Sequence, residues 1–471
     1  MEKLSKIKEL DMTGVKDRPS LTEGPLFVKI ITYVIPIILT GVLQLLYNTA
    51  DQIVVGQFSG DPNALAAVGS TSSATALIVN VIVGMSAGAV VIMSQSFGAR
   101  QEHLISRAVH TVVTFAAIAG LLFATLGFTV TEPLLAALGT KAEYIDSAVS
   151  YMRIIMCGVP ASVLYNFSAC VFRAKGDSRT PFIILSLSGI VNVILNLIFV
   201  IVFHMGVAGV ATATIISQYI SATAVIVLLM RTRESYRLEL RKLGIDPIML
   251  KRILTVGVPS GVQSAFFAVS NMLVQSAINT LSVPEVGGNT VGNTIESYSY
   301  IILNSYYHAT MTFVGQNFGA GRMDRVKRTL RLSCIQVVVI GISVGLLFSV
   351  FSRELAILFV DMTQPNAEAI IEAAVIRNWT TLPFYFICGL MESLTAYQRA
   401  LGSSLRPMVI TLFSVCVFRV AWAKLVFPLI GGAVALYAVY PLSWLICTVV
   451  HLLFSIRLTK KIIRTNSDLV V

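Results

Sequence analysis

The sequence predicts an all-α integral membrane protein with twelve transmembrane helices in two pseudosymmetric six-helix lobes around a central cleft. Three observations predict this fold: an apolar composition, twelve apolar segments of membrane-spanning length, and an internal repeat of six such segments. Hydrophobic residues make up 55% of the chain and charged residues only 13%. Charged residues make up about 25% of a soluble domain, so this chain cannot cover a globular surface with polar groups.

Twelve segments are apolar and long enough to cross a hydrocarbon core, which takes about 20 helical residues. We expect them at residues 28–58, 64–97, 104–130, 144–172, 181–203, 207–230, 253–281, 290–318, 332–352, 369–398, 408–428 and 432–456. The first segment is too long for a cleaved signal and lacks a small-residue cleavage site, so we expect it to be retained.

Lys and Arg are unevenly distributed between the two sets of loops. The N-terminal tail, the loops after even-numbered segments and the C-terminal tail hold 29 of the 35 bases, whereas the opposite loops hold only Lys141 and Arg353. Basic loops remain on the cytoplasmic side, so we expect cytoplasmic termini and a location in the plasma membrane. The net charge of +11 therefore reflects topology, and we predict no nucleic-acid partner.

The two halves of the chain resemble each other at an offset of 221 to 226 residues. The matches include Pro36 with Pro259, Asn48 with Asn271, Gln95 with Gln316, and 173–181 with 399–407. Because each half holds six spans, both halves begin on the same side and are parallel repeats. Two lobes around a cleft favour alternating access over a pore.

This repeat divides the chain into five parts. We expect a cytoplasmic N-terminal tail (1–27), an N-lobe (28–230), a cytoplasmic linker (231–252), a C-lobe (253–456) and a cytoplasmic C-terminal tail (457–471).

Several motifs resemble those of multidrug and toxic compound extrusion (MATE) transporters of the bacterial and archaeal type. They are Leu-Thr-Glu-Gly-Pro at 21–25, Tyr-Asn-Thr-Ala-Asp-Gln at 47–52, Gln-Ser-Phe-Gly-Ala at 95–99, and Arg-Ala-x-Gly-x-Ser at 173–178 and 399–404. The resemblance covers nearly the whole chain. It implies antiport in a lipid bilayer, in which small organic, often cationic, compounds leave as H+ or Na+ enters, without another cofactor. We expect a monomer.

Polar residues lie at a similar predicted depth in three N-lobe segments: Asp51, Asn192, Asn196 and Thr214. The two asparagines are four residues apart and share one helix face. Carboxylate, amide and hydroxyl oxygens are hard donors, which suit Na+ near Asp51 or a carboxyl that binds and releases H+. The resemblance implies the same site, with Asp51 as its sole acid because the second position of the Asn pair is Asn196. The alternative for the asparagines is interhelical hydrogen bonding.

Two glutamates lie inside predicted C-lobe spans, where charges are costly. Glu296 precedes several aromatic residues and His308, a setting that can hold an organic cation by charge and cation–π attraction. The alternative is a salt bridge from Glu296 to Arg419 or Lys424. Glu392 lies seven residues before Arg399 on roughly the same helix face, which favours a structural ion pair.

Other patterns carry no chemistry in our interpretation. Gly84-Met-Ser-Ala-Gly88 matches the GxSxG hydrolase pattern, but inside a span its small residues allow close helix packing. The five histidines are scattered, and the six cysteines form no CxxC pair, so we predict no enzyme and no metal centre. The alternative function is a lipid-linked sugar flippase of the same superfamily. It would need several bases for pyrophosphate, whereas this chain offers Arg419 and Lys424.

Four prolines lie one to a span and match between the halves: Pro36, Pro160, Pro259 and Pro383. Each removes a backbone hydrogen bond and permits a kink. We predict bends in the first and seventh spans, with the first span as the moving element.

Overall fold

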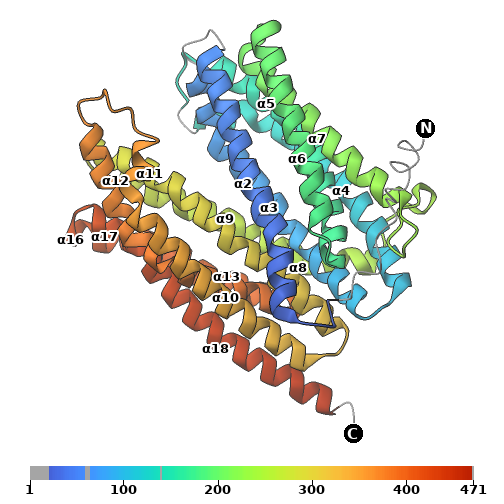
Figure 1. The fold of residues 1–471 in the computed structure, drawn as a ribbon. Coiled ribbons are helices and arrows are strands. Elements are labelled where there is room, and N and C mark those ends of the chain that lie inside the picture. Colours follow the sequence, from blue (N-terminus) through green and yellow to red (C-terminus); the bar gives the residue numbers. More distant parts are fainter. Residues whose placement is uncertain (1–20, 59–63, 138–139, 469–471) are drawn as a thin grey trace, which may run out of the picture.

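The computed structural model describes residues 21–58, 64–137 and 140–468, which form helices and loops without a strand (Figure 1). The N-lobe contains α2 (Leu26–Phe58), α3 (Ala64–Gly98), α4 (Glu102–Ala137), α5 (Ile145–Lys175), α6 (Arg179–Leu197) with the π-helix η1 (Ile198–Val202), and α7 (Gly206–Arg231). Most of the predicted N-terminal tail lies outside the described residues.

The connection to the C-lobe contains one 3-10 turn, η2 (Leu240–Lys242). The C-lobe contains α8 (Pro247–Ile278), α9 (Val283–Gly319), α10 (Met323–Val350), α11 (Ser352–Ile357), α12 (Ala367–Thr381), η3 (Leu382–Phe384), α13 (Tyr385–Ala400), α14 (Leu405–Thr411), η4 (Leu412–Val417), α15 (Phe418–Ala421), η5 (Trp422–Val426), α16 (Phe427–Ile430), α17 (Ala433–Tyr437) and α18 (Val439–Asp468). The stretch from α14 to α16 is one continuous rod in which η4 and η5 are π-helical.

The predicted twelve-span fold is confirmed. Within the described part of the chain, ten helices are long and apolar enough to cross a membrane. The other two spans are α9, which is rich in Asn, Ser and Tyr, and α12–η3–α13, which is interrupted at Pro383. These two spans also carry the C-lobe glutamates.

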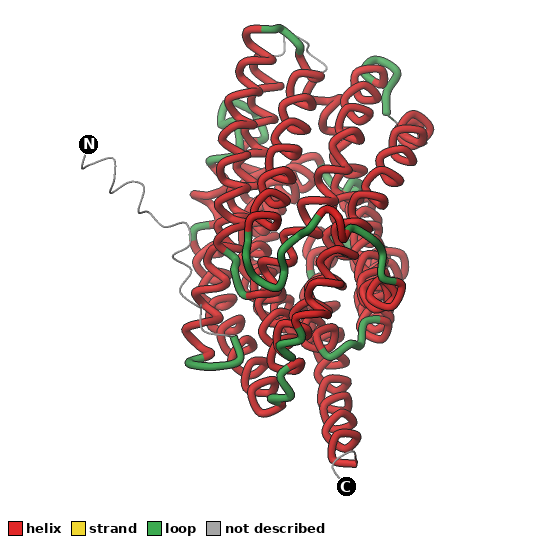
Figure 2. Tube along the Cα trace, turned by 90° about the vertical axis from the view of Figure 1, so that its right-hand side faces the viewer, coloured by secondary structure: helices red, strands yellow, loops and turns green. Residues whose placement is uncertain are grey.

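Several helices extend beyond the predicted spans. The helix α8 begins at Pro247, inside the predicted linker, because Asp246 accepts hydrogen bonds from the Ile248 and Met249 amides and Pro247 occupies the first turn. The helix α10 begins at Met323 and α18 runs on to Asp468, so both carry basic turns past the apolar core. Figure 2 shows α18 projecting from the bundle at its C-terminal end.

The two lobes approach each other at one end of the bundle and diverge toward the other (Figure 1). The end where they approach is called the basic end here, because the loops that it holds contain Lys or Arg or lie within three residues of one: 99–101, 176–178, 232–246, 320–322 and 401–404. Along this approach, α3 packs on α8. A Cβ on Gly84 would lie 2.9 Å from the Gly261 Cα, and one on Gly88 would overlap the Ile253 carbonyl oxygen. The packing interpretation of Gly84–Gly88 is therefore confirmed.

A symmetric contact joins the lobes at the basic end. The Gln95 amide donates to the Ala400 carbonyl at 2.9 Å, and the matching Gln316 amide donates to the Ala174 carbonyl at 2.6 Å. Gly98 packs directly on the Gln316 backbone, and Gly319 packs on that of Gln95. We call this contact the seam. Its residues belong to the motifs that repeat in the sequence.

The segment 21–25 ties both lobes together beside the seam. Arg322 donates to the Thr22 carbonyl at 2.6 Å, and Arg325 donates to the Gly24 carbonyl at 3.2 Å. Glu23 pairs with Arg100 of the N-lobe at 3.4 Å. This short segment therefore contacts both lobes at the basic end.

The matched prolines fall into two groups. Pro36, Pro160 and Pro259 lie inside continuous helices, whereas Pro383 lies in η3, where the helix is broken. The predicted bends of the first and seventh spans stay predictions.

We expect Gly98→Leu to separate the lobes at the basic end, because a side chain there meets the Gln316 backbone. Overpacking of about 1–3 kcal/mol would move the two-state equilibrium by roughly 5- to 150-fold toward the form open at this end. Electron–electron resonance distances between spin labels in loops 99–101 and 401–404, on a cysteine-free background, measure the shift. Gly69→Leu is the matched control, because a Cβ at Gly69 meets nothing within 4 Å. An unchanged distance distribution in Gly98→Leu would contradict the seam.

A second prediction concerns the start of α8. The Met249 amide and then the Arg107 guanidinium hold the pKa of Asp246 below its ordinary value. A lowered native pKa stabilises the fold above the unfolded value of about 3.9, and the stabilisation disappears as the pH falls through the native pKa. We expect wild type to melt at a higher temperature than Asp246→Asn at pH 7, with the gap closing only as the pH falls below about 4. A gap that stays constant from pH 7 down to about pH 2 would exclude the ionised cap.

Candidate functional site

The structure brings the four predicted N-lobe residues together from α2, α6 and α7. The Asn196 amide donates to Asp51 and lies 3.4 Å from the Asn192 amide oxygen. The Asn192 amide in turn donates to the Thr214 hydroxyl at 3.4 Å. These four residues are called the Asp51 cage.

The Asp51 cage is rich in oxygen and contains no base. Asn196 is fully buried, and its side-chain oxygen has no hydrogen-bond partner among the described residues. No described Lys, Arg or His lies within ion-pair distance of Asp51. A half-buried carboxylate beside a buried, unpartnered amide oxygen fits a small cation, which would bind both.

The predicted salt bridge of Glu296 has a different partner. Arg377 of α12, which is fully buried, donates to Glu296 at 2.6 Å, and Tyr385 donates to the other carboxylate oxygen at 3.1 Å. The expected pairing with Arg419 or Lys424 is therefore wrong. With both oxygens engaged, the Glu296 carboxylate is less available to an organic cation than the sequence predicted.

Arg419 lies in α15, between the two π-helical stretches, and is 1% exposed. It donates to Asn271 of α8 at 2.7 Å and to Ser443 of α18 at 3.0 Å. Its guanidinium lies 4.6 Å from the centre of the Tyr440 ring. The Nη2 atom has no hydrogen-bond partner among the described residues. Lys424, five residues further on, is exposed.

The predicted pair of Glu392 with Arg399 is not formed. Arg399 instead donates to the Tyr307 hydroxyl and, at 2.8 Å, to the Gln263 side chain. In the described part of the chain, no hydrogen bond reaches the Glu392 carboxylate.

His308, which the sequence suggested as part of a substrate site, stacks edge-on against Tyr307. Its Nδ1 atom is buried without a partner among the described residues. It therefore makes no described contact with either glutamate.

Sequence reasoning missed Arg377 and Asn271 as site residues. Both carried a usable signal. Arg377 is a charge inside a predicted span, which by itself marks a functional or paired residue. Asn271 matches Asn48 in the internal repeat.

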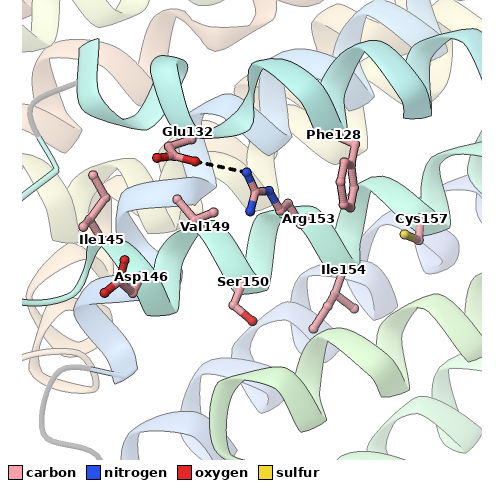
Figure 3. A pocket seen from close by; sticks show the side chains of 9 residues that line it. All are labelled: Phe128, Glu132, Ile145, Asp146, Val149, Ser150, Arg153, Ile154 and Cys157. Carbon is pink, nitrogen blue, oxygen red and sulfur yellow. Dashed lines mark hydrogen bonds and ion pairs between the residues drawn. The ribbon is translucent and has the colours of Figure 1, made fainter.

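A pocket of about 420 Å³ opens between α4 and α5 (Figure 3). Arg153 pairs there with Glu132 at 3.1 Å and lies 5.4 Å from the centre of the Phe128 ring. Arg153 therefore lies within a predicted span but is paired with Glu132 at this pocket, and it belongs neither to the Asp51 cage nor to the Glu296–Arg377 pair.

Comparison with known proteins places both lobes in one family. A family model described as MatE matches residues 36–198 and 259–424, once in each half. The probable multidrug resistance protein YoeA of Bacillus subtilis (strain 168) is 27% identical over 411 residues, which cover 86% of each chain.

Solved structures share the fold. A MOP superfamily transporter of Pyrococcus furiosus, described as having a binding pocket of reverse polarity, superposes with a TM-score of 0.86 at 22% identity, covering 93% of this chain and 97% of that chain. An outward-facing multidrug resistance MATE family transporter superposes with the same TM-score, identity and coverage.

We expect Glu296→Gln to destabilise the protein by about 3–5 kcal/mol, because it leaves the Arg377 charge buried without a counter-ion. The double variant Glu296→Gln with Arg377→Met should recover part of this loss. Free energies of unfolding in detergent measure both effects. The matched control is Glu132→Gln, which breaks an exposed pair and should cost less than about 1 kcal/mol. Equal costs for the two Glu→Gln variants would refute a buried ion pair.

Proposed function

Because the chain belongs to the multidrug and toxic compound extrusion (MATE) family, we propose that it is a secondary active exporter of small organic compounds. It exchanges them for inward-moving H+ or Na+ by alternating access. The observation that carries the proposal is the Asp51 cage, a half-buried carboxylate beside an unpartnered amide oxygen with no described base within ion-pair distance.

Orientation follows from the charges of the loops. We propose that the basic end faces the cytoplasm of the cell and that both termini lie there, because basic loops remain on that side of a membrane. The predicted lobes 28–230 and 253–456 then move against each other as a monomer, around the linker 231–252. With the seam formed, the protein is closed toward the cytoplasm.

The cation acts by changing which partners Asp51 prefers. Na+ would bind the Asp51 carboxylate and the Asn196 side-chain oxygen, with the Thr214 hydroxyl nearby. A proton would turn the carboxyl into a donor, so that it could bond to the same amide oxygen. In both cases the buried negative charge is neutralised. The two conformations then change in population, because a ligand shifts an equilibrium through its differential affinity for the two states.

The substrate class is argued from the C-lobe. The sequence-based expectation of a cationic compound depended on Glu296, whose carboxylate is engaged by Arg377 and Tyr385. We therefore propose amphipathic organic compounds, in keeping with the multidrug resistance relative, without requiring a positive charge.

The lipid-linked sugar flippase is not favoured. Arg377 and Arg399 add two buried bases to those expected from the sequence, but both bond to residues of their own lobe. Arg377 already has the Glu296 carboxylate as its counter-ion, and the family match supports an exporter.

We expect Asp51→Asn to abolish gradient-driven transport of an amphipathic organic dye in proteoliposomes, with a loss of at least about 100-fold, while folding and dye binding are retained. The amide has no charge for the cation to neutralise, so the populations no longer respond to the gradient. Asn196→Ala should reduce transport less, since it removes one of several oxygen donors. Imposing H+ and Na+ gradients separately identifies the coupling ion.

Asp146→Asn, the same change at an exposed N-lobe carboxyl, is the control and should transport normally. If Asp51→Asn moves the dye at the wild-type rate under both gradients, the Asp51 cage is not the coupling site. Glu392 would then be the next carboxylate to test.

A further inference from the structure

The two lobes build equivalent polar sites from equivalent helices. In the N-lobe, the Asp51 cage joins the first, fifth and sixth spans, α2, α6 and α7. In the C-lobe, Arg419 joins the first, fifth and sixth spans of that half, through Asn271 of α8, α15 and Ser443 of α18. The internal repeat thus places one three-helix polar site in each lobe.

The charge of the two sites is opposite. The N-lobe site centres on a carboxylate, whereas the C-lobe site centres on a guanidinium, which stays protonated in proteins. The groups that contact the Arg419 guanidinium in the described part of the chain are neutral: the Asn271 and Ser443 side chains and the rings of Phe267 and Tyr440. No described carboxylate lies within ion-pair distance of it, and Glu296, which acts on it electrostatically, is paired with Arg377.

Arg419 also has unused hydrogen-bonding capacity. Its side chain is 1% exposed, yet Nη2 has no partner among the described residues, and Nη1 donates to Asn271 alone. The two N–H groups left on the outer edge of a guanidinium match the two oxygens of a carboxylate or phosphate. A buried guanidinium that lacks a counter-ion costs free energy unless an anion binds to it.

The backbone on both sides of Arg419 has an unusual helical geometry. The residue lies between η4 and η5, two π-helical stretches, and in the N-lobe η1 begins two residues after Asn196. Such π-helical turns are rare and often occur at functional sites. The equivalent span is therefore distorted beside the polar site in both lobes.

We propose that Arg419 binds an anionic group, a carboxylate or phosphate, of the compound that the protein exports. This inference rests on the proposed transport function and makes it more specific. The exported compound then carries an anionic oxygen group held by Nη1 and Nη2, and an organic body that packs on the Tyr440 and Phe267 rings. The N-lobe receives the cation while the C-lobe receives the anionic group.

A pair of dyes that differ by one group tests the site. Tetramethylrhodamine carries a free carboxylate, and its methyl ester does not. We expect the wild-type protein to bind the acid at least about 10-fold more tightly than the ester in fluorescence anisotropy titrations. Arg419→Gln should remove this preference while leaving ester affinity within about twofold of wild type.

Two further variants separate binding from folding. Asn271→Asp places a carboxylate beside Nη1, so it should fill the site internally, remove the preference and leave the melting temperature unchanged or higher. Lys424→Gln removes one positive charge from the same rod at an exposed position and should keep the preference. The proposal is overturned if the wild type does not prefer the acid, if Asn271→Asp retains the preference, or if Arg419→Gln weakens both dyes equally.

Uptake into proteoliposomes distinguishes this inference from the transport proposal. If the acid preference is present and depends on Arg419, but an ion gradient moves neither dye, the anion site stands and the transport function fails. If the gradient moves the ester while no acid preference exists, transport stands and the anion site fails.

Discussion

Polar groups inside this bundle depend on partners within the protein, because the hydrocarbon core of a membrane offers none. Most such groups are satisfied locally; the Thr40 hydroxyl, for example, donates to the Pro36 carbonyl one turn earlier. The fully buried Arg377 is paired across helices with Glu296, although its Nη1 atom has no hydrogen-bond partner among the described residues. Among the buried side-chain atoms without a partner in the described residues, Asn196 Oδ1 and Arg419 Nη2 lie on equivalent helices of the two lobes. This equivalence supports the proposal that both sites bind a ligand.

The sequence predicted the twelve spans and the Asp51 cage because both depend on properties that hydropathy and helical periodicity report. Asp51, Asn196 and Thr214 were placed at one depth by counting residues from the helix ends, and these helices have no break before the cage. The same counting failed for Glu296. Its partner Arg377 lies in α12, just before the interruption at Pro383, and depth alone does not specify which way a side chain points around its helix axis.

The charged residues of α9 and α12–α13 lower the hydropathy of these spans. The same charged residues are the ones whose pairing the sequence did not predict. These spans carry Glu296, Arg377, Glu392 and Arg399, so they are the least apolar parts of the bundle. Their partners were not predictable from each span taken alone, because Glu296, Arg377 and Arg399 bond to residues of other helices. The C-lobe interior therefore contains several charged side chains, whereas Asp51 is the single acid well inside the predicted spans of the N-lobe.

The seam has a further consequence. Gly98 contacts Gln316 while Gly319 contacts Gln95, which is the reciprocity that defines an isologous interface between identical subunits, although here it lies within one polypeptide. In a homodimer, each mutation would alter both copies of the contact. In a fused duplicate, each copy changes independently. Asn317 shows the result: it faces the Leu21 carbonyl and Arg325, whereas its counterpart Ser96 bonds only to its own helix. Covalent duplication thus permits the asymmetry that a symmetric dimer forbids, including opposite charges in its two halves.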